Sequence, residues 1–281
     1  MGVIINGREI SEKIRLNLKK RVNKLRENGK SVTLAVILVG DDPASKIYVK
    51  NKRKACEELG IISKEYSLPE NISEKELIYL IRKLNSDNTV DGILVQLPLP
   101  SHIDAKNIID VISVEKDVDG FCKYNVGSLF TKDYKFLPCT PNGILEILKY
   151  ENIELRGKHC VILGRSNIVG KPLSLLLLNN DATVTVCHSK TNNLKELCRT
   201  ADVIISAIGR AKFLTEDMVK AGAVIIDVGI NRDEFGKICG DVDFENVKEK
   251  ASYITPVPGG VGPMTVTMLM ENVVLAAEKI R

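Results

Sequence analysis

Tyr48 and Lys52 are one helical turn apart, so on a helix their side chains project from the same face. Ala55 and Leu59 make that face partly apolar. A lysine that loses hydration beside a tyrosine on such a face can act as an acid and base in proton transfer. The alternative is a lysine whose stem follows the helix edge while its ammonium stays in water. The pair fits both interpretations, so the neighbouring motifs must decide between them.

Two further polar residues stand where ligands of α/β proteins bind. Gln96 breaks an apolar strand pattern that Pro98 and Pro100 then terminate. Because ligands gather at the carboxyl ends of parallel strands, Gln96 is expected to hydrogen-bond a substrate or hold Lys52; the alternative is a glutamine that only caps the loop.

Asp119 belongs to Lys116–Gly120, which lacks the remaining ligands of a calcium loop. We expect Asp119 to accept hydrogen bonds from a ligand's N–H groups.

A glycine-containing turn, Gly164–Pro172, separates an apolar strand pattern from a helix pattern. Backbone N–H groups and the helix dipole at such a turn can bind a phosphate. The turn is not a P-loop, because five residues separate Gly164 from Gly170 and Pro172 stands where Ser or Thr would bind magnesium. The alternative is an ordinary tight turn without a ligand.

The end of the next strand pattern indicates which dinucleotide this turn would bind. An NAD pocket usually has Asp or Glu there to hold the ribose 2′-hydroxyl, whereas this sequence has His188, Ser189 and Lys190. Arg165 suits a 2′-phosphate, because a guanidinium makes paired, charge-assisted hydrogen bonds. The residues therefore favour NADP over NAD, although Ser189 and Lys190 alone also fit a solvated turn.

Short apolar strand patterns alternate with helical patterns, which is typical of an α/β fold with a parallel sheet. In the first half, Asp42 and Pro43 start a helix that runs to about Leu59, and Ser73 opens a capping box. The pattern changes near Pro138–Pro141 and restarts at His159, which predicts a second, Rossmann-type domain. The predicted strands are Thr33–Val39, Ile61–Leu68, Val90–Gln96, Thr183–Cys187, Val203–Ala207 and Val224–Val228, and a last helix spans about Pro263–Lys279.

Length and composition limit the class of protein. At about 150 residues per domain, 281 residues suggest two domains. Forty Lys and Arg against 36 Asp and Glu are interspersed, which does not favour a nucleic-acid partner. The apolar stretches are too short to span a membrane and no signal peptide is evident, which predicts a cytoplasmic protein. The seven cysteines form no C-x-x-C pair, so neither a disulfide framework nor a metal site is expected.

The motifs together, in their order along the chain, resemble the bifunctional methylenetetrahydrofolate dehydrogenase/cyclohydrolase family. The match runs nearly end to end. It comprises Val39–Ser45 with Tyr48 and Lys52, Gln96–Pro100, Lys116–Gly120, Pro138–Pro141, Gly164–Pro172, Asp227–Asn231, Gly240–Asp243 and Thr255–Thr265. One departure is Ser128, where many relatives would have an arginine.

The resemblance implies roles for individual residues. Lys52 would be the catalytic acid and base, Tyr48 would stack on the folate and orient Lys52, and Gln96 would support the lysine. Asp119 would hold the pterin ring. The other substrate-binding residues would be Val95, Leu97, Pro258, Gly259, Gly260, Gly262, Pro263, Met264 and Thr265. The cofactor-binding residues would be Gly164, Arg165, Ser166, Ser189 and Ile230, with Cys139 and Thr140 nearby.

The resemblance also implies a homodimer and two α/β domains around a cleft. Residues 1–140, completed by a C-terminal helix over 263–281, would form the folate-binding catalytic domain, and 141–262 the Rossmann-type NADP-binding domain. The implied enzyme oxidises 5,10-methylenetetrahydrofolate with NADP and hydrolyses the methenyl product to 10-formyltetrahydrofolate, a step of one-carbon metabolism that serves purine biosynthesis. The alternatives are another two-domain NADP dehydrogenase, acting on a hydroxy acid or a shikimate-like substrate, and a non-catalytic NADP-binding module.

Overall fold

The computed structural model describes residues 2–279, which form two compact units. Unit 1 contains the described residues through Glu12 together with Thr140–Thr265. Unit 2 contains Lys13–Cys139 and the described residues from Val266 onward. Residues 1, 280 and 281, which the predicted catalytic domain includes, lie outside the described part of the chain. None of the described helices is both long enough and apolar enough to span a membrane.

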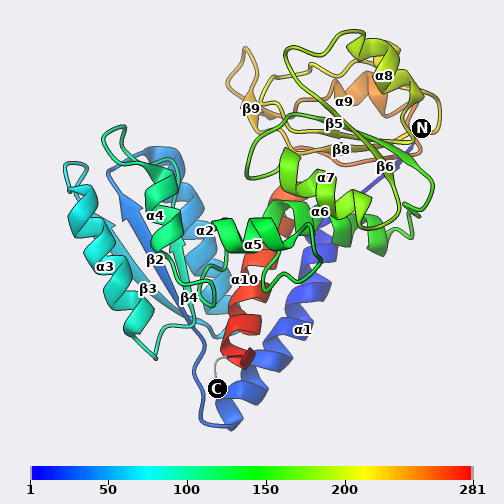
Figure 1. Cartoon of the computed structure of the whole chain (residues 1–281). Helices are drawn as coiled ribbons and strands as arrows, with labels where there is room; N and C mark the ends of the chain where they lie inside the picture. The colour runs from blue at the N-terminus through cyan, green and yellow to red at the C-terminus, as the bar shows by residue number, and fades with distance from the viewer. Residues whose placement is uncertain (1, 280–281) are drawn as a thin grey trace. The chain divides into compact units, whose positions relative to one another are not determined.

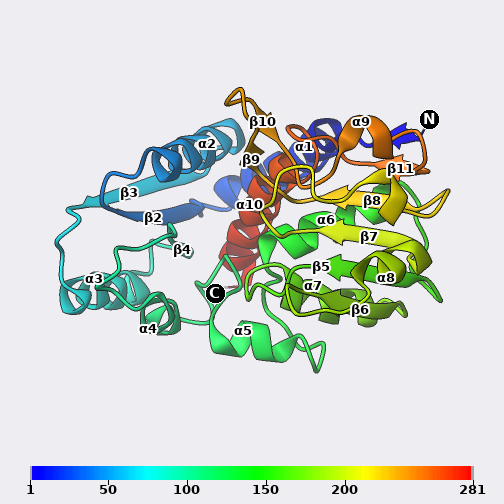
Figure 2. The same cartoon turned by 90° about the horizontal axis from the view of Figure 1, so that it is seen from above.

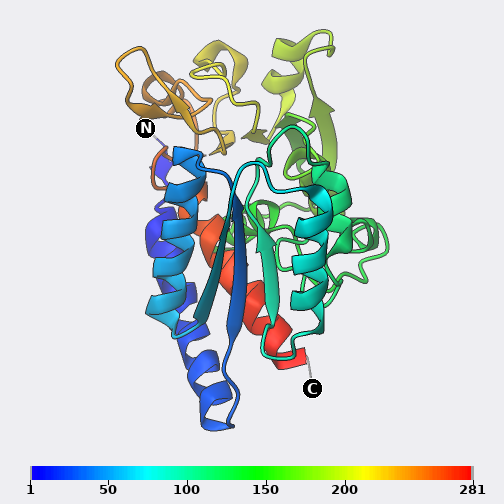
Figure 3. The ribbon, with the colours of Figure 1, turned by 90° about the vertical axis from the view of Figure 1, so that its left-hand side faces the viewer.

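Unit 2 is built on a three-stranded parallel sheet in the order β3-β2-β4. The strands are β2 (Thr33–Val39), β3 (Ile62–Leu68) and β4 (Gly92–Val95). Figure 3 shows these strands between helix α3 (Glu74–Ser86) and helix α2 (Pro43–Leu59). Alternate residues of β2, Ala35, Ile37 and Val39, belong to the apolar cluster that α3 contributes to, as the period of a strand requires.

Local signals in the sequence determine where α2 and α3 begin. The Asp42 carboxylate accepts the Ser45 N–H at 2.7 Å before α2, and Gly60 ends α2 with a φ of +77°, which favours glycine. Ser73 forms the predicted capping box with Glu76 before α3. The predicted helix over Pro43–Leu59 and the predicted capping box are confirmed.

Four more helices contribute to unit 2. The short helices α4 (Ala105–Val111) and α5 (Lys123–Ser128) follow β4. The long helices α1 (Gly7–Glu27) and α10 (Val261–Lys279) each begin in unit 1 and continue in unit 2 (Figure 1). Within unit 2, Arg21 on α1 donates two hydrogen bonds to the Glu278 carboxylate of α10, at 3.0 and 2.7 Å. The sequence patterns predict α10 but not α1.

Unit 1 is built on a six-stranded sheet in the order β1-β11-β8-β7-β5-β6, all of its pairs parallel. The chain passes from β5 to β6 on one side and then to β7 on the other side of β5, so the strand order reverses there (Figure 2). Such a reversal is where doubly wound sheets bind ligands, at the carboxyl ends of the strands. The strands are β1 (Val3–Ile4), β5 (His159–Leu163), β6 (Thr183–Cys187), β7 (Val203–Ser206), β8 (Val224–Asp227) and β11 (Tyr253–Ile254).

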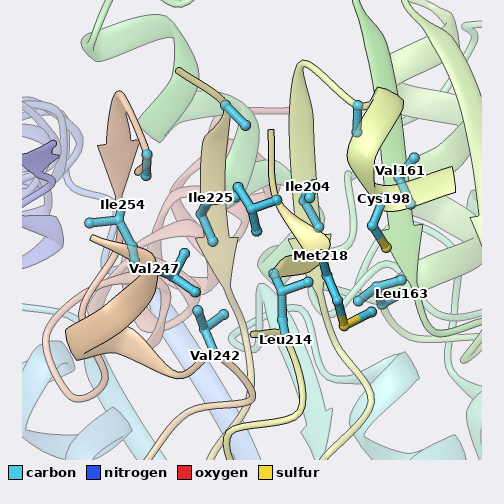
Figure 4. Packing of buried hydrophobic residues seen from close by; sticks show 14 of the residues in the cluster. Val161, Leu163, Cys198, Ile204, Leu214, Met218, Ile225, Val242, Val247 and Ile254 are labelled. Carbon is cyan, nitrogen blue, oxygen red and sulfur yellow. The ribbon is translucent and has the colours of Figure 1, made fainter. Parts of the chain in front are cut away.

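One face of this sheet carries a buried apolar core (Figure 4). Val161, Ile204, Ile225 and Ile254 lie on four neighbouring strands and pack against residues of the elements that cover them. The remaining elements of this part of the chain are α6 (Cys139–Tyr150), α7 (Gly170–Leu178), α8 (Leu194–Thr200), the 3-10 turn η1 (Glu216–Met218), α9 (Phe244–Val247) and a hairpin of β9 (Asn231–Arg232) with β10 (Ile238–Cys239).

Candidate active site

Lys52 and Gln96 meet in unit 2, although 44 positions separate them in the sequence. Lys52 Nζ, on α2, donates to Gln96 Oε1 at 3.0 Å. Gln96 follows directly after β4, where its backbone N–H donates to Ile37 O at 2.9 Å and its side-chain Nε2 donates to Leu97 O at 2.6 Å. Both ends of the glutamine amide are therefore engaged, so the amide presents its oxygen to the lysine. Of the three roles that the sequence leaves open for Gln96, the hydrogen bond to Lys52 favours holding the lysine, and the hydrogen bond to Leu97 O also fits capping of the loop.

Tyr48 precedes Lys52 by one turn of α2 and is 40% exposed. Lys52 itself is half-buried, and the residues that follow on the inner side of the helix, Ala55 and Leu59, are buried. A tyrosine ring that exposed has an open surface on which a planar ligand can stack. The structure thus places the two polar residues at the edge of the apolar face, with the aromatic ring accessible.

Asp119 lies close enough to Lys52 for the two charges to interact. Burial raises the pKa of Asp119 to about 6, and the negative charge of Asp117 adds to that rise, whereas the positive charge of Lys52 opposes it. Cys139 Sγ lies 3.9 Å from Asp119 Oδ1, and burial together with this carboxylate raises the pKa of the Cys139 thiol well above its ordinary value. Cys139 therefore stays a neutral thiol beside Asp119.

A small pocket in unit 2 brings Asp119 together with two other residues of the predicted substrate site, Val95 and Leu97. The remaining lining residues are Ile93, Ile109, Ile112, Asp117 and Phe121. The pocket combines an apolar wall with the carboxylates of Asp117 and Asp119. Lys116 and Asp117, in contrast, support the backbone: the Lys116 ammonium donates to Leu84 O and Asp87 O, and the Asp117 carboxylate accepts from Cys122 N.

Asn272 on α10 supports the backbone beside the candidate site, a role that the sequence motifs do not reveal. It is buried, and its Nδ2 donates to Val118 O at 2.8 Å and to Leu137 O at 2.9 Å, with Cys139 Sγ at 3.7 Å. The side chain thereby ties together the segments that carry Asp119 and Cys139. Only an asparagine among the apolar residues of the last helix could have indicated this role from the sequence.

The glycine-containing turn of unit 1 connects β5 to α7 and has no room for a side chain at its two glycines. Gly164 has a φ of +116°, and a Cβ there would lie 2.3 Å from Ala207 O. A Cβ on Gly170 would lie 2.1 Å from Gly164 O. Ser166 Oγ accepts the Val169 and Gly170 N–H groups at 3.2 and 3.4 Å, at the start of α7. The predicted strand–turn–helix arrangement is present.

Arg165 and Ser189 follow neighbouring strands at matching positions. Leu163 of β5 pairs with Cys187 of β6, and Gly164 N donates to Cys187 O at 2.9 Å, so the two strands end together. Arg165 and Ser189, each two residues beyond that pair, are both exposed. Residues 188–190 contain no carboxylate. This edge of the sheet therefore offers a guanidinium and a hydroxyl to a negatively charged group.

The other predicted residues of unit 1 lie in the turn after β8, in the turn before α10 and at the starts of α6 and α10. Ile230 follows β8, is 56% exposed and directly precedes the β9–β10 hairpin. In the turn before α10, Gly259 has a φ of +111° and a Cβ on Gly260 would lie 2.7 Å from Pro256 O, so both glycines are required. Pro258 and Gly262 are exposed, and Pro263 is partly exposed. Thr265 Oγ1 and Thr140 Oγ1 are hydrogen-bonded at 3.0 Å, whereas Met264 is fully buried beside Gly143.

Comparison with known proteins relates this geometry to a family. Residues 5–119 match the family model of the tetrahydrofolate dehydrogenase/cyclohydrolase catalytic domain. Residues 138–281 match the model of the tetrahydrofolate dehydrogenase/cyclohydrolase NAD(P)-binding domain. The chain belongs to the tetrahydrofolate dehydrogenase/cyclohydrolase family. The predicted family and the predicted fold of two α/β domains are therefore confirmed.

Similar proteins and structures cover this family member over nearly its whole length. The bifunctional protein FolD of Bacillus mycoides is 58% identical over 99% of this chain and 98% of its own length. The crystal structure of the bifunctional FolD enzyme of Campylobacter jejuni is 54% identical, covers 99% of both chains and superimposes with a TM-score of 0.97. A Trypanosoma brucei FolD crystal structure, complexed with NADP cofactor and an inhibitor, is 37% identical, covers 99% of this chain and 98% of its own, and has a TM-score of 0.94.

Proposed function

We propose that this chain oxidises 5,10-methylenetetrahydrofolate with NADP and then hydrolyses the 5,10-methenyl product to 10-formyltetrahydrofolate. The dehydrogenase and cyclohydrolase classes follow from the family, which both halves of the chain match. The observation that carries the hydrolytic half of the proposal is the Lys52–Gln96 hydrogen bond beside Asp119. A dehydrogenase with another substrate, or a non-catalytic NADP-binding module, would not require Lys52, Gln96 and Asp119 to lie together.

The residues at the edge of unit 1 fit NADP. The turn between β5 and α7 has glycines where a Cβ would collide with the protein's own backbone, and it leads into the N-terminus of α7, where backbone N–H groups can bind a phosphate. Arg165 and Ser189 are exposed at the ends of adjacent strands, and residues 188–190 lack the carboxylate that would repel a 2′-phosphate. We propose Gly164, Arg165, Ser166, Ser189 and Ile230 as the residues that hold the cofactor, with Thr140 and Cys139 in a supporting role.

In the oxidation step, the bound nicotinamide ring of NADP supplies the hydride acceptor. Loss of hydride from the methylene carbon leaves a cation that the adjacent folate nitrogens stabilise, so this step needs alignment more than a strong base. We propose that the Tyr48 ring and the walls formed by Val95 and Leu97 position the folate, and that Asp119 accepts two N–H groups of the pterin. Pro258, Gly259, Gly260, Gly262, Pro263, Met264 and Thr265 complete the proposed substrate-binding set.

In the hydrolysis step, water must lose a proton as it attacks the methenyl carbon, and N5 must gain a proton as the ring opens. Lys52 is the proposed group that moves these protons, and Gln96 Oε1 fixes the position of its nitrogen. Tyr48 orients Lys52 from one turn earlier on α2. No cofactor is needed for this half of the reaction, which makes it separable from the oxidation by experiment.

The wider setting is also proposed from the family resemblance. We propose that the folate-binding catalytic domain spans residues 1–140 with 263–281, and that the NADP-binding domain spans 141–262. We further propose a cytoplasmic homodimer that acts in one-carbon metabolism and supplies 10-formyltetrahydrofolate to purine biosynthesis. The described residues contain no helix able to span a membrane.

Two assays on the purified chain test the proposed function. With 5,10-methylenetetrahydrofolate and NADP, NADPH absorbance should grow and 10-formyltetrahydrofolate should accumulate. With the 5,10-methenyl compound and no cofactor, the methenyl absorbance should decay faster than in buffer. NADPH formation with a hydroxy acid but not with the folate would contradict the proposal, and so would NADP binding without turnover of either folate.

A further inference from the structure

Asp241 is a fully buried carboxylate that faces hydrogen-bond donors from two segments of unit 1, residues 206–210 and Asn231. Its Oδ2 accepts from Ser206 Oγ at 3.2 Å, Ile208 N at 2.8 Å and Gly209 N at 3.2 Å. Its Oδ1 accepts from Arg210 N and Asn231 Nδ2, both at 2.9 Å. A carboxylate that accepts from several backbone N–H groups holds their segments in one arrangement.

A second buried carboxylate, that of Asp227, holds the backbone around Asp241 in place. Asp227 Oδ1 accepts from Gly229 N and Asp241 N, and its Oδ2 accepts from Val242 N, all at 2.9 Å. Thr255 Oγ1 in turn accepts the Asp227 N–H at 2.7 Å. Near the end of β8, the buried carboxylates of Asp227 and Asp241 therefore both accept backbone N–H groups, and one of the groups that Asp227 accepts is the N–H of Asp241.

The close approach explains two glycines in the motifs Asp227–Asn231 and Gly240–Asp243. A Cβ on Gly229 would lie 2.2 Å from Asp241 Oδ1, and a Cβ on Gly240 would lie 1.8 Å from Asp227 Oδ2. No side chain fits at either position without displacing a carboxylate. Gly229 and Gly240 thus leave the space that the two carboxylates occupy.

The segments that Asp241 holds lie at the edge of the sheet proposed to bind the cofactor. Residues 208–210 follow β7, and Gly164, which opens the proposed phosphate-binding turn, would collide with Ala207 O if it had a Cβ. Ile230, a proposed cofactor contact, lies between Gly229, whose N–H Asp227 accepts, and Asn231, whose amide Asp241 accepts. The Asp241 carboxylate therefore holds two segments in place, the turn that follows β7 and the turn that follows β8.

We propose that Asp241 is a positioning residue for the cofactor, because it holds the turn at 208–210 and the turn carrying Ile230 in the arrangement that receives NADP. The proposal rests on the proposed function of the chain as an NADP-dependent dehydrogenase. Asp241 is fully buried, so it does not contact the cofactor itself and acts only by holding these turns. Its loss should therefore weaken NADP binding without abolishing the cofactor-independent hydrolysis.

Asp241→Asn is the most direct variant. The asparagine keeps the size of the side chain but, in either orientation of its amide, turns an N–H₂ group toward backbone N–H donors. Asp243→Asn is the matched control, since Asp243 lies two residues further along, is only partly buried and accepts from the exposed Asn246 side chain. For each protein we would measure the NADPH dissociation constant from the enhancement of its fluorescence, the KM for NADP, kcat, and the rate of methenyltetrahydrofolate hydrolysis without cofactor.

Asp241→Asn should raise the NADPH dissociation constant and the KM for NADP at least tenfold, while hydrolysis stays within twofold of wild type. Asp243→Asn should leave all values within twofold. An NADPH dissociation constant within twofold of wild type in folded Asp241→Asn would overturn the proposal. Equal losses of binding and hydrolysis would also overturn it, because they would show a general structural role.

If Asp241→Asn does not fold, Ser206→Ala decides the question, since it removes only one donor to Asp241. It should weaken NADPH binding at least threefold with hydrolysis unchanged, and unchanged binding would overturn the proposal. The wild-type measurement separates this inference from the function on which it rests. A wild-type chain that binds no NADPH contradicts the proposed function, whereas wild-type binding that Asp241→Asn retains contradicts only the role of Asp241.

Discussion

Arg165 carries the proposed choice between NADP and NAD. Its exposed guanidinium lies at the end of β5 next to the end of β6, where the sequence has Ser189 and no carboxylate. Arg165→Ala should remove a charge-assisted contact of about 1.5–3 kcal/mol to the 2′-phosphate and raise the KM for NADP roughly tenfold or more. The KM for NAD, which lacks that phosphate, should change little. Steady-state kinetics with both cofactors checks this, and equal losses with the two cofactors would remove Arg165 from the selection.

Asp119 should give the folate reactions an acidic limb in their pH profile. Because burial raises the pKa of Asp119 to about 6, above the ordinary value of 3.8, its protonated fraction grows as the pH falls through 6. Protonation removes acceptor capacity for the pterin, so kcat/KM for folate should fall about tenfold between neutral pH and pH 5. Asp119→Asn should lower kcat/KM of both activities at neutral pH and lose this limb. An unchanged limb in that variant would assign the titration to another group.

The sequence could identify Lys52 and Gln96 as candidates, but it could not show that the two side chains are in contact. The i, i+4 spacing identifies Tyr48 and Lys52, and the polar residue at a strand end identifies Gln96. That Lys52 Nζ lies 3.0 Å from Gln96 Oε1 depends on how α2 packs beside β4. The same holds for Asp241, whose five donors come from segments that only the folded sheet brings together.

At the scale of elements, α10 supports the segments around Asp119 and Cys139 through Asn272. Its side chain donates to Val118 O and Leu137 O, which adjoin the segments of Asp119 and Cys139. Asn272→Leu should leave Leu137 O without this amide donor and Val118 O with only the Cys139 thiol at 3.5 Å, and should lower the free energy of unfolding by roughly 2 kcal/mol. The KM for folate should rise because Asp119 loses its support. Urea denaturation and folate kinetics test both effects, and a variant with wild-type values in both would show that Asn272 supports neither.

Elements with strong local signals were predictable, and elements made by distant pairing were not. The strand over Thr33–Val39 and helix α2 are confirmed because an apolar run, a capping aspartate, a proline and a glycine all agree. The two-residue strands β1 and β11 are too short to show a period and exist because they pair with each other across the sequence. Helix α1 was missed although Ile10, Leu18 and Val22, all buried, recur at helical spacing.

At the scale of the whole molecule, the proposed homodimer has a direct measurement. Two chains of 31.0 kDa should give a particle of about twice that mass in light scattering coupled to size-exclusion chromatography. The mass should stay constant on dilution through the micromolar range if the dimer is obligate. A particle with the mass of one chain at all concentrations would contradict the proposed homodimer. It would not contradict the proposed dehydrogenase and cyclohydrolase activities.

The proposed hydrolysis depends on Lys52 as the group that moves protons. Lys52→Met keeps the approximate length of the side chain and removes the amine, so hydrolysis should fall by roughly 10²–10⁴-fold. Oxidation needs alignment more than a base, so its loss should be smaller, and methenyltetrahydrofolate should accumulate during NADP reduction. Lys54→Met, at a more exposed lysine of the same helix, is the matched control and should keep both activities.

The decisive measurement is the hydrolysis of 5,10-methenyltetrahydrofolate without cofactor, corrected for the spontaneous reaction, in wild type, Lys52→Met and Lys54→Met, with folding checked by circular dichroism. We predict rapid hydrolysis by wild type and Lys54→Met and almost none by Lys52→Met. Hydrolysis at the wild-type rate by folded Lys52→Met would contradict the account.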